Sequence, residues 1–205
     1  MDTFLQLNKE KLRAIFFRLS FALLGVVSIV FLIAYLTCNL PDGQLLFYIL
    51  LTTTIGVPIF IMLVGYIVWF INLRARQKTF SKVPFNDIEK IGFHKAYLDE
   101  SSKWVLTEEI KEGKLNGFAL RMNLSKEKGY HFIEFDIPVE WRKLEKSEYK
   151  SLTEKFKQHN VEFRIGSMVK LYDTRQQILQ AVSDIKEDLE LFTTLLRQEG
   201  FEPKT

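Results

Sequence analysis

The sequence predicts a two-helix transmembrane hairpin followed by a cytosolic α+β domain. Two observations support this fold class. The first third of the chain holds two long apolar runs. After Lys78 the pattern changes to alternating apolar and charged residues, and a helical spacing follows near the C-terminus. We therefore divide the 205 residues into a hairpin over 1–79 and a sensor or interaction domain over 80–205.

The two apolar runs, 15–36 and 45–71, are the predicted membrane spans. Each exceeds the roughly 20 residues that a helix needs to cross about 30 Å of hydrocarbon. A helix is required because backbone polar groups find no water there. Beyond Arg18 at one edge, the spans carry no acid, lysine, arginine or histidine. A monomeric transporter is therefore disfavoured, since proton and ion pathways need such residues.

Basic residues flank the two runs on the side of the chain ends. Lysines and arginines occur at 9, 11, 13 and 18 before the first run, and at 74, 76 and 78 after the second. The connecting loop 37–44 has none, and its one charge is Asp42. By the positive-inside rule both termini are cytoplasmic, and the turn at 41–43 faces out. We predict a multi-pass protein of the bacterial inner (plasma) membrane.

The second span contains small and kinking residues. Thr52 and Gly56 form a pair of small residues four apart, which lets another helix approach closely. Pro58 removes a backbone donor, so a kink is expected. These residues serve either packing within the hairpin or an oligomeric seam.

The elements of the domain follow from periodicity and turn residues. Strands are expected over 103–110, 115–122 and 130–137, with a turn at Gly113 and an end at Pro138. A helix from Ser147 to about 158, a strand over 161–172 and a long helix over 174–198 complete the domain. The result is an antiparallel meander followed by helix, strand and long helix.

The last predicted helix carries an apolar stripe in heptad spacing. Its members are Ile178, Val182, Ile185, Leu189, Phe192 and Leu196. The stripe either packs on the domain's own sheet or mediates self-association. The opposite face is expected to be exposed and acidic, with Asp184, Glu187, Asp188 and Glu190.

Charge and cysteine content exclude several classes of protein. Residues 1–79 carry seven lysines and arginines against three acids, whereas residues 80–205 carry 21 against 22. Bulk DNA binding is therefore not expected of the domain, because it requires surplus cations. The single cysteine, Cys38, excludes an intramolecular disulfide framework.

No catalytic or cofactor motif is present. The three histidines lack a second metal ligand at helical spacing, and no GxSxG, P-loop or GxGxxG occurs. Glu134 and Asp136 lie two apart on a strand, a spacing that suits shared acid/base work but is usual for a solvated face. We predict a protein that is not an enzyme and has no metal or cofactor.

A ligand pocket is the more plausible site. His94, Lys95 and Tyr97 precede Lys103 and Trp104, which joins cations to stacking rings. Two further residues, Arg121 and His131, repeat this chemistry. Anionic nucleotides are held by charge-assisted bonds to phosphate and by base stacking. The alternative interpretation is a plain half-buried sheet with charged rims.

A two-span hairpin with a small cytosolic sensing domain resembles, in overall plan, the CRISPR-associated membrane effectors that bind cyclic oligoadenylate in antiphage defence. The similarity covers the arrangement of the whole chain and no sequence motif. It implies that ligand binding reorganises a homo-oligomer, through the hairpin or through helix 174–198, and perturbs the lipid bilayer. The alternative function is a non-enzymatic anchored adaptor, accessory subunit or immunity protein that docks a protein partner.

Overall fold

The computed structural model describes residues 2–37, 42–125, 127–140, 146–164, 166–176 and 181–204. The chain divides into two compact units. The first comprises Met1–Asn72 with Asp99–Glu108, and the second comprises Leu73–Leu98 with Glu109–Thr205. Cys38, Pro41 and Ile178, singled out above, lie outside the described residues.

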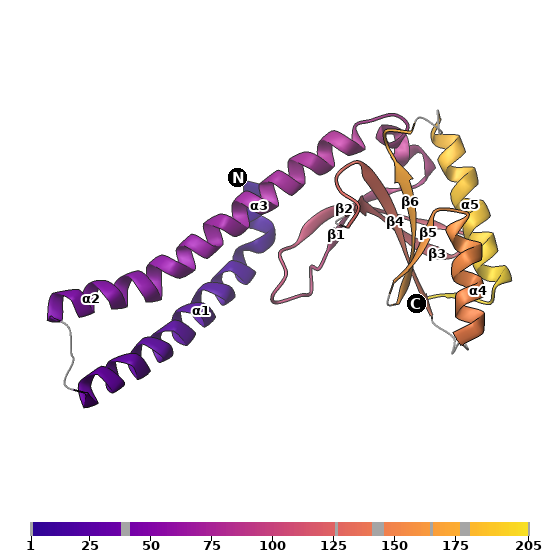
Figure 1. The fold of residues 1–205 in the computed structure, drawn as a ribbon. Helices are drawn as coiled ribbons and strands as arrows, with labels where there is room; N and C mark the ends of the chain where they lie inside the picture. The colour runs from indigo at the N-terminus through magenta and orange to yellow at the C-terminus, as the bar shows by residue number, and fades with distance from the viewer. Residues whose placement is uncertain are drawn as a thin grey trace. The chain divides into compact units, whose positions relative to one another are not determined.

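Two long helices dominate the first unit (Figure 1). One is α1 (Asp2–Leu36). The other runs through α2 (Gly43–Leu51), the π-helical η1 (Thr52–Gly56) and α3 (Val57–Phe80), whose end belongs to the second unit. Both are long and apolar enough to cross a membrane, and few of their residues are buried within the chain. They indicate membrane association, and the expected pair of apolar helices is confirmed.

The π-helical turn explains how the second helix accommodates Pro58. A proline cannot donate to the carbonyl four residues earlier, here that of Thr54. The hydrogen-bond pattern shifts just before it, because the N–H of Val57 donates to the carbonyl of Thr52, five residues back. The hydroxyl of Thr54 donates to the carbonyl of Leu50 at 2.7 Å. The turn packs against α1. This contact agrees with the interpretation that the small residues of the second span serve packing within the hairpin.

The second unit is built on a mainly antiparallel sheet. The strand order is β1-β2-β3-β4-β6-β5, and the short β7 pairs with β4. Their bounds are β1 (His94–Leu98), β2 (Glu108–Leu115), β3 (Phe118–Leu124), β4 (Phe132–Glu140), β5 (Val161–Arg164), β6 (Ser167–Asp173) and β7 (Glu202–Pro203). An antiparallel sheet with helices confirms the α+β class.

The first predicted hairpin was wrong in its register. Strand β2 passes through Gly113, and the turn lies at Asn116 and Gly117, whose φ angles are 50° and 84°. Two positive φ angles are what a two-residue hairpin turn needs, and Asn-Gly provides them. Gly113 serves packing instead, since a Cβ there would meet the ring of Phe93 at 2.9 Å.

Three further boundaries differ from prediction. Strand β4 continues past Pro138, which pairs with Ser167 of β6. The expected strand 161–172 is the hairpin β5–β6, with Gly166 at φ 81° in its turn. Helix α5 begins at Val182 and not at 174. At its start the Asp184 carboxylate accepts the Ala181 N–H at 3.0 Å.

The core lies between the sheet and helices α4 (Lys146–Lys157) and α5 (Val182–Gln198), which lie side by side on one face (Figure 1). The stripe members Ile185, Leu189, Phe192 and Leu196 are at most 2% exposed. The interpretation that the stripe packs on its own sheet is confirmed. The 3-10 helix η2 (Phe85–Ile91) adds to the same core.

Candidate ligand-binding site

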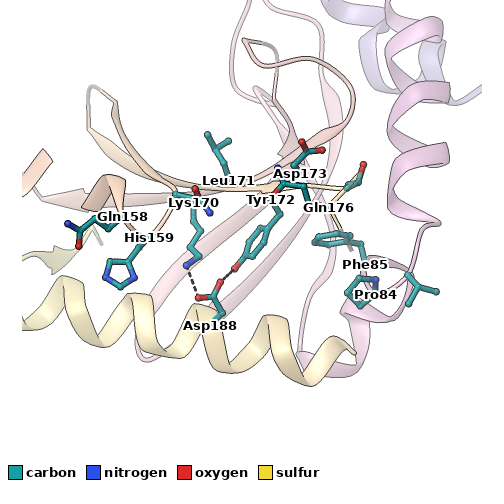
Figure 2. A pocket seen from close by; sticks show the side chains of 13 residues that line it. Pro84, Phe85, Gln158, His159, Lys170, Leu171, Tyr172, Asp173, Gln176 and Asp188 are labelled. Atoms are coloured by element: carbon teal, nitrogen blue, oxygen red, sulfur yellow. Dashed lines mark hydrogen bonds and ion pairs between the residues drawn. The ribbon is translucent and has the colours of Figure 1, made fainter. Parts of the chain in front are cut away.

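A cavity of about 380 Å³ opens in the second unit beside strand β6 (Figure 2). Its volume falls in the range of about 300–1,000 Å³ usual for small-ligand sites. Four segments form its wall: β6, the turn after α4, the start of η2 and the turn after β6. Helix α5 contributes Asp188.

A buried lysine is the central charged group of the cavity. Lys170 is 4% exposed, and its Nζ lies 2.7 Å from an oxygen of Asp188. Figure 2 shows Asp188 reaching from α5 toward β6, where Lys170 and Tyr172 lie. An ammonium has three donors, and the contact with Asp188 uses one. A ligand acceptor in the cavity can take another.

Tyr172 shares the same carboxylate. Its hydroxyl donates to the second oxygen of Asp188 at 2.7 Å. Burial raises the pKa of Tyr172 well above its ordinary value, and the neighbouring Asp188 carboxylate adds to this effect. Asp188 therefore holds two donors from β6, and the tyrosine stays a neutral donor.

Aromatic and amide side chains line the remaining wall. Phe85 packs against Tyr172 with ring centroids 6.0 Å apart, and His159 lies in the turn after α4. Gln158, Asn160 and Gln176 also line the cavity. Rings offer stacking faces, and amides offer paired donors and acceptors. This combination suits a planar heterocycle such as a nucleobase.

The charges near Asp173 are mostly paired. The Arg175 guanidinium donates to both carboxylate oxygens of Asp173, and this bond lowers the pKa of Asp173 to about 2. Lys82 donates to the Thr174 hydroxyl at 3.2 Å. Lys170 and Arg175 are thus paired with Asp188 and Asp173, and Lys82 beside the rim adds one further cation, which suits a ligand with one negative charge.

The predicted residues of β1 lie at the opposite edge of the sheet from β5. His94, Lys95 and Tyr97 are exposed there. The structure brings two of them together, with Lys95 Nζ 5.6 Å from the Tyr97 ring centroid. Lys95 also pairs with Glu109 at 2.7 Å, and this hydrogen bond raises the pKa of Lys95.

Arg121 and His131 are placed separately. Arg121 lies on β3 opposite Glu112 of β2, with a charged contact of 3.6 Å. His131 precedes β4, and its backbone carbonyl accepts the N–H of the cavity residue Thr174 at 2.8 Å. This backbone bond ties His131 to the cavity wall.

Lys103 and Trp104 belong to the first unit, in the loop that precedes β2. The predicted strand over 103–110 was wrong here, since β2 starts at Glu108. Trp104 is 65% exposed, and the Arg18 guanidinium lies 4.2 Å from its ring centroid.

Glu134 of the predicted carboxylate pair has a structural role. Glu134 is 7% exposed and accepts two hydrogen bonds from Arg164, at 3.2 and 2.8 Å. The solvated face expected at Glu134 was therefore wrong at this residue. A bidentate Arg–carboxylate pair fixes β5 beside β4 across β6. Among the described residues no group of three His, Cys, Asp or Glu side chains could hold a metal.

Sequence reasoning missed the cavity residues. Asp188 was assigned to the exposed face of the last helix, yet it lies three residues after Ile185 and four before Phe192, both buried. That spacing places it on the core side. The signal for Lys170 was a lysine inside the apolar run Met168–Leu171. No protein-family model, curated protein or solved structure matches this chain.

Proposed function

We propose that this protein is a membrane-anchored sensor whose sheet unit binds a nucleotide-type ligand in the cavity beside β6. The observation that carries the proposal is the buried Lys170, held by Asp188 among aromatic and amide side chains. Lysine donors suit a phosphate, and the rings and amides suit a base.

The cavity volume favours one nucleotide unit. At about 380 Å³ it lies near the lower end of the range for small-ligand sites. An adjoining hollow of about 320 Å³ shares four lining residues with it, Asn160, Leu171, Asp173 and Gln176. A cyclic oligonucleotide would therefore extend into that hollow or bridge two copies of the chain.

The cavity wall is connected along the chain to the second long helix, so that ligand binding can act on this helix. Val83, Pro84 and Phe85 line the cavity, and they lie three to five residues after the end of α3. A ligand shifts such a segment only if it binds one conformation more tightly. The positive-inside pattern of the sequence predicts that both termini are cytoplasmic. That binding reorganises an oligomeric hairpin in antiphage defence stays a prediction, based on the resemblance in plan.

Thermal unfolding of the full chain in detergent tests the ligand. A ligand at about 100 times its Kd adds roughly 2.7 kcal/mol of stability and raises the Tm. The panel contains mononucleotides, cyclic dinucleotides and cyclic oligonucleotides. We expect one of them to raise the Tm of the wild type and of His94→Ala, and to have little effect on His159→Ala.

The two histidine variants are matched, because one histidine lines the cavity and the other is exposed on β1. A shift lost in His94→Ala and kept in His159→Ala would move the site to β1. No shift with any ligand would contradict the sensor and favour the alternative, an anchored adaptor that docks a protein partner.

A further inference from the structure

Side chains from α1 fix the loop that precedes β2, residues 99–107, within the first unit. The Lys11 ammonium donates to the carbonyls of Asp99 and Val105, the latter at 2.8 Å. The Asn8 side chain accepts the N–H of Thr107 at 2.7 Å. Lys11 is 9% exposed and Asn8 is fully buried. Two buried polar side chains form hydrogen bonds to backbone atoms of the loop, which indicates that the loop has a fixed conformation.

The second long helix fixes the same loop. Trp69 of α3 is buried, and its indole N–H donates to the Thr107 carbonyl at 2.9 Å. Phe4 of α1 packs on Trp69 with ring centroids 5.0 Å apart. The loop thus completes a small core at the base of the helix pair.

Arg18 defines the membrane level of the loop. It is the last charged residue of α1 before the uncharged stretch 19–36. Those 18 residues span about 27 Å as a helix, close to the hydrocarbon thickness of about 30 Å. Arg18 therefore lies at a hydrocarbon boundary, and the ring of Trp104 stacks on it.

The tip of the loop presents apolar side chains at this level. Trp104 is 65% exposed and Val105 is 47% exposed. The Ser102 hydroxyl accepts their backbone N–H groups at 3.3 and 3.1 Å, which holds the tip in a turn. Tryptophan is enriched at membrane interfaces, where one end of its ring is apolar and the other is wet.

A hollow of about 670 Å³ separates the loop from α1. Its charged lining comprises Lys9, Lys11, Arg18, Lys103, Glu10 and Glu100. Ser101 and Ser102 add hydroxyls. Within the described ranges no ion pair involves Lys9, Arg18 or Lys103, whereas Lys95 and Lys170 of the sheet unit are paired. An arginine stacked on an aromatic ring still presents N–H groups to an anion.

We propose that loop 99–107 is a membrane-contacting loop that binds an anionic phospholipid. Trp104 and Val105 insert at the interface, and Arg18 and Lys103 hold the headgroup phosphate beside the serine hydroxyls. The proposal rests on the membrane anchorage of the helices. It is independent of the cavity ligand.

Tryptophan quenching in nanodiscs tests the loop. The full chain is reconstituted in phosphatidylcholine with a fixed fraction of phosphatidylglycerol, and either lipid carries brominated chains. The Trp104 signal is the difference between the wild type and Trp104→Phe. We expect brominated phosphatidylglycerol to quench it more per molecule than brominated phosphatidylcholine. Arg18→Gln with Lys103→Gln should lower this preference at least about fivefold, since each cation near an anionic surface contributes about that factor.

The controls separate structure from recognition. The double substitution leaves the bonds of Lys11, Asn8 and Trp69 to the loop in place. Lys114→Gln removes an exposed cation of β2 and should not change the preference. Absence of Trp104 quenching by either lipid would refute the membrane contact. Equal quenching per molecule by the two lipids, or a preference that survives the double substitution, would refute the headgroup site. A nucleotide-induced Tm shift is unaffected by each of these results.

Discussion

Replacing Asp188 with asparagine tests the buried pair at the centre of the cavity. Lys170 is 4% exposed, so in this variant its charge would lose the carboxylate that pairs with it in a dry environment. Removing one partner of a buried pair costs about 3–5 kcal/mol. The Asp188 side chain is 31% exposed, and water can replace part of the interaction. We therefore expect Asp188→Asn to lower the free energy of unfolding by about 2–3 kcal/mol.

The reverse substitution should cost less. In Lys170→Met the carboxylate of Asp188 keeps the Tyr172 hydroxyl and its access to water. A loss of about 1–2 kcal/mol is expected. The double variant Lys170→Met with Asp188→Asn has no unpaired charge, and the asparagine oxygen still accepts the tyrosine. Its cost should be at most about 1 kcal/mol, which corresponds to a coupling of about 2–5 kcal/mol.

Hydrogen exchange of the full chain in detergent measures these free energies at the β6 amides. Core strands exchange through openings close to global unfolding, so their protection reports the stability of the unit. A cost under about 1 kcal/mol for Asp188→Asn would refute the buried-charge argument. So would a double variant whose cost equals the sum of the two single costs.

Two further predictions concern packing and pH. Gly113→Ala places a Cβ 2.9 Å from the Phe93 ring and should destabilise the unit by about 1–3 kcal/mol. In a Phe93→Leu background part of this stability should be recovered. Hydrogen exchange at the β6 amides measures both effects. Asp173 has a lowered pKa of about 2, so its pairing with Arg175 stabilises the folded state above the ordinary aspartate pKa. The stability of the wild type should therefore fall as the pH drops from about 4 toward 2, and that of Asp173→Asn should fall less. An equal loss of stability in the two proteins over this pH range would contradict the prediction.

The sequence predicted the elements better than their boundaries. Apolar length alone identifies the two long helices, and the heptad stripe identifies the buried face of α5. The turn was wrongly predicted at Gly113 because the sequence alone does not distinguish a glycine within a strand from a glycine in a turn. The Asn116–Gly117 pair was the stronger turn signal. Pro138 did not end β4 because β6 still pairs with it.

The candidate site depended on contacts that no linear pattern contains. Lys103 and Trp104 follow Lys95 closely in the sequence, and grouping them assumed one continuous surface. Buried hydrogen bonds from Lys11 and Trp69 instead hold their loop on the helices. Asp188 shows the opposite case, in which counting helical positions was sufficient to place the residue toward the core.

The two proposed binding sites differ in whether their cations form ion pairs. In the sheet unit Lys95, Lys128 and Lys170 each have a carboxylate within 2.8 Å, so a ligand there gains little from bulk charge and must match shape and hydrogen bonds. At the membrane loop the cations Arg18 and Lys103 form no ion pair among the described residues. The carboxylates of Glu10 and Glu100 line the same hollow, but they face four cations, Lys9, Lys11, Arg18 and Lys103. The chemistry predicted from cations beside aromatic rings therefore fits the proposed lipid site better than β1, and for the cavity we expect a ligand with a base to recognise.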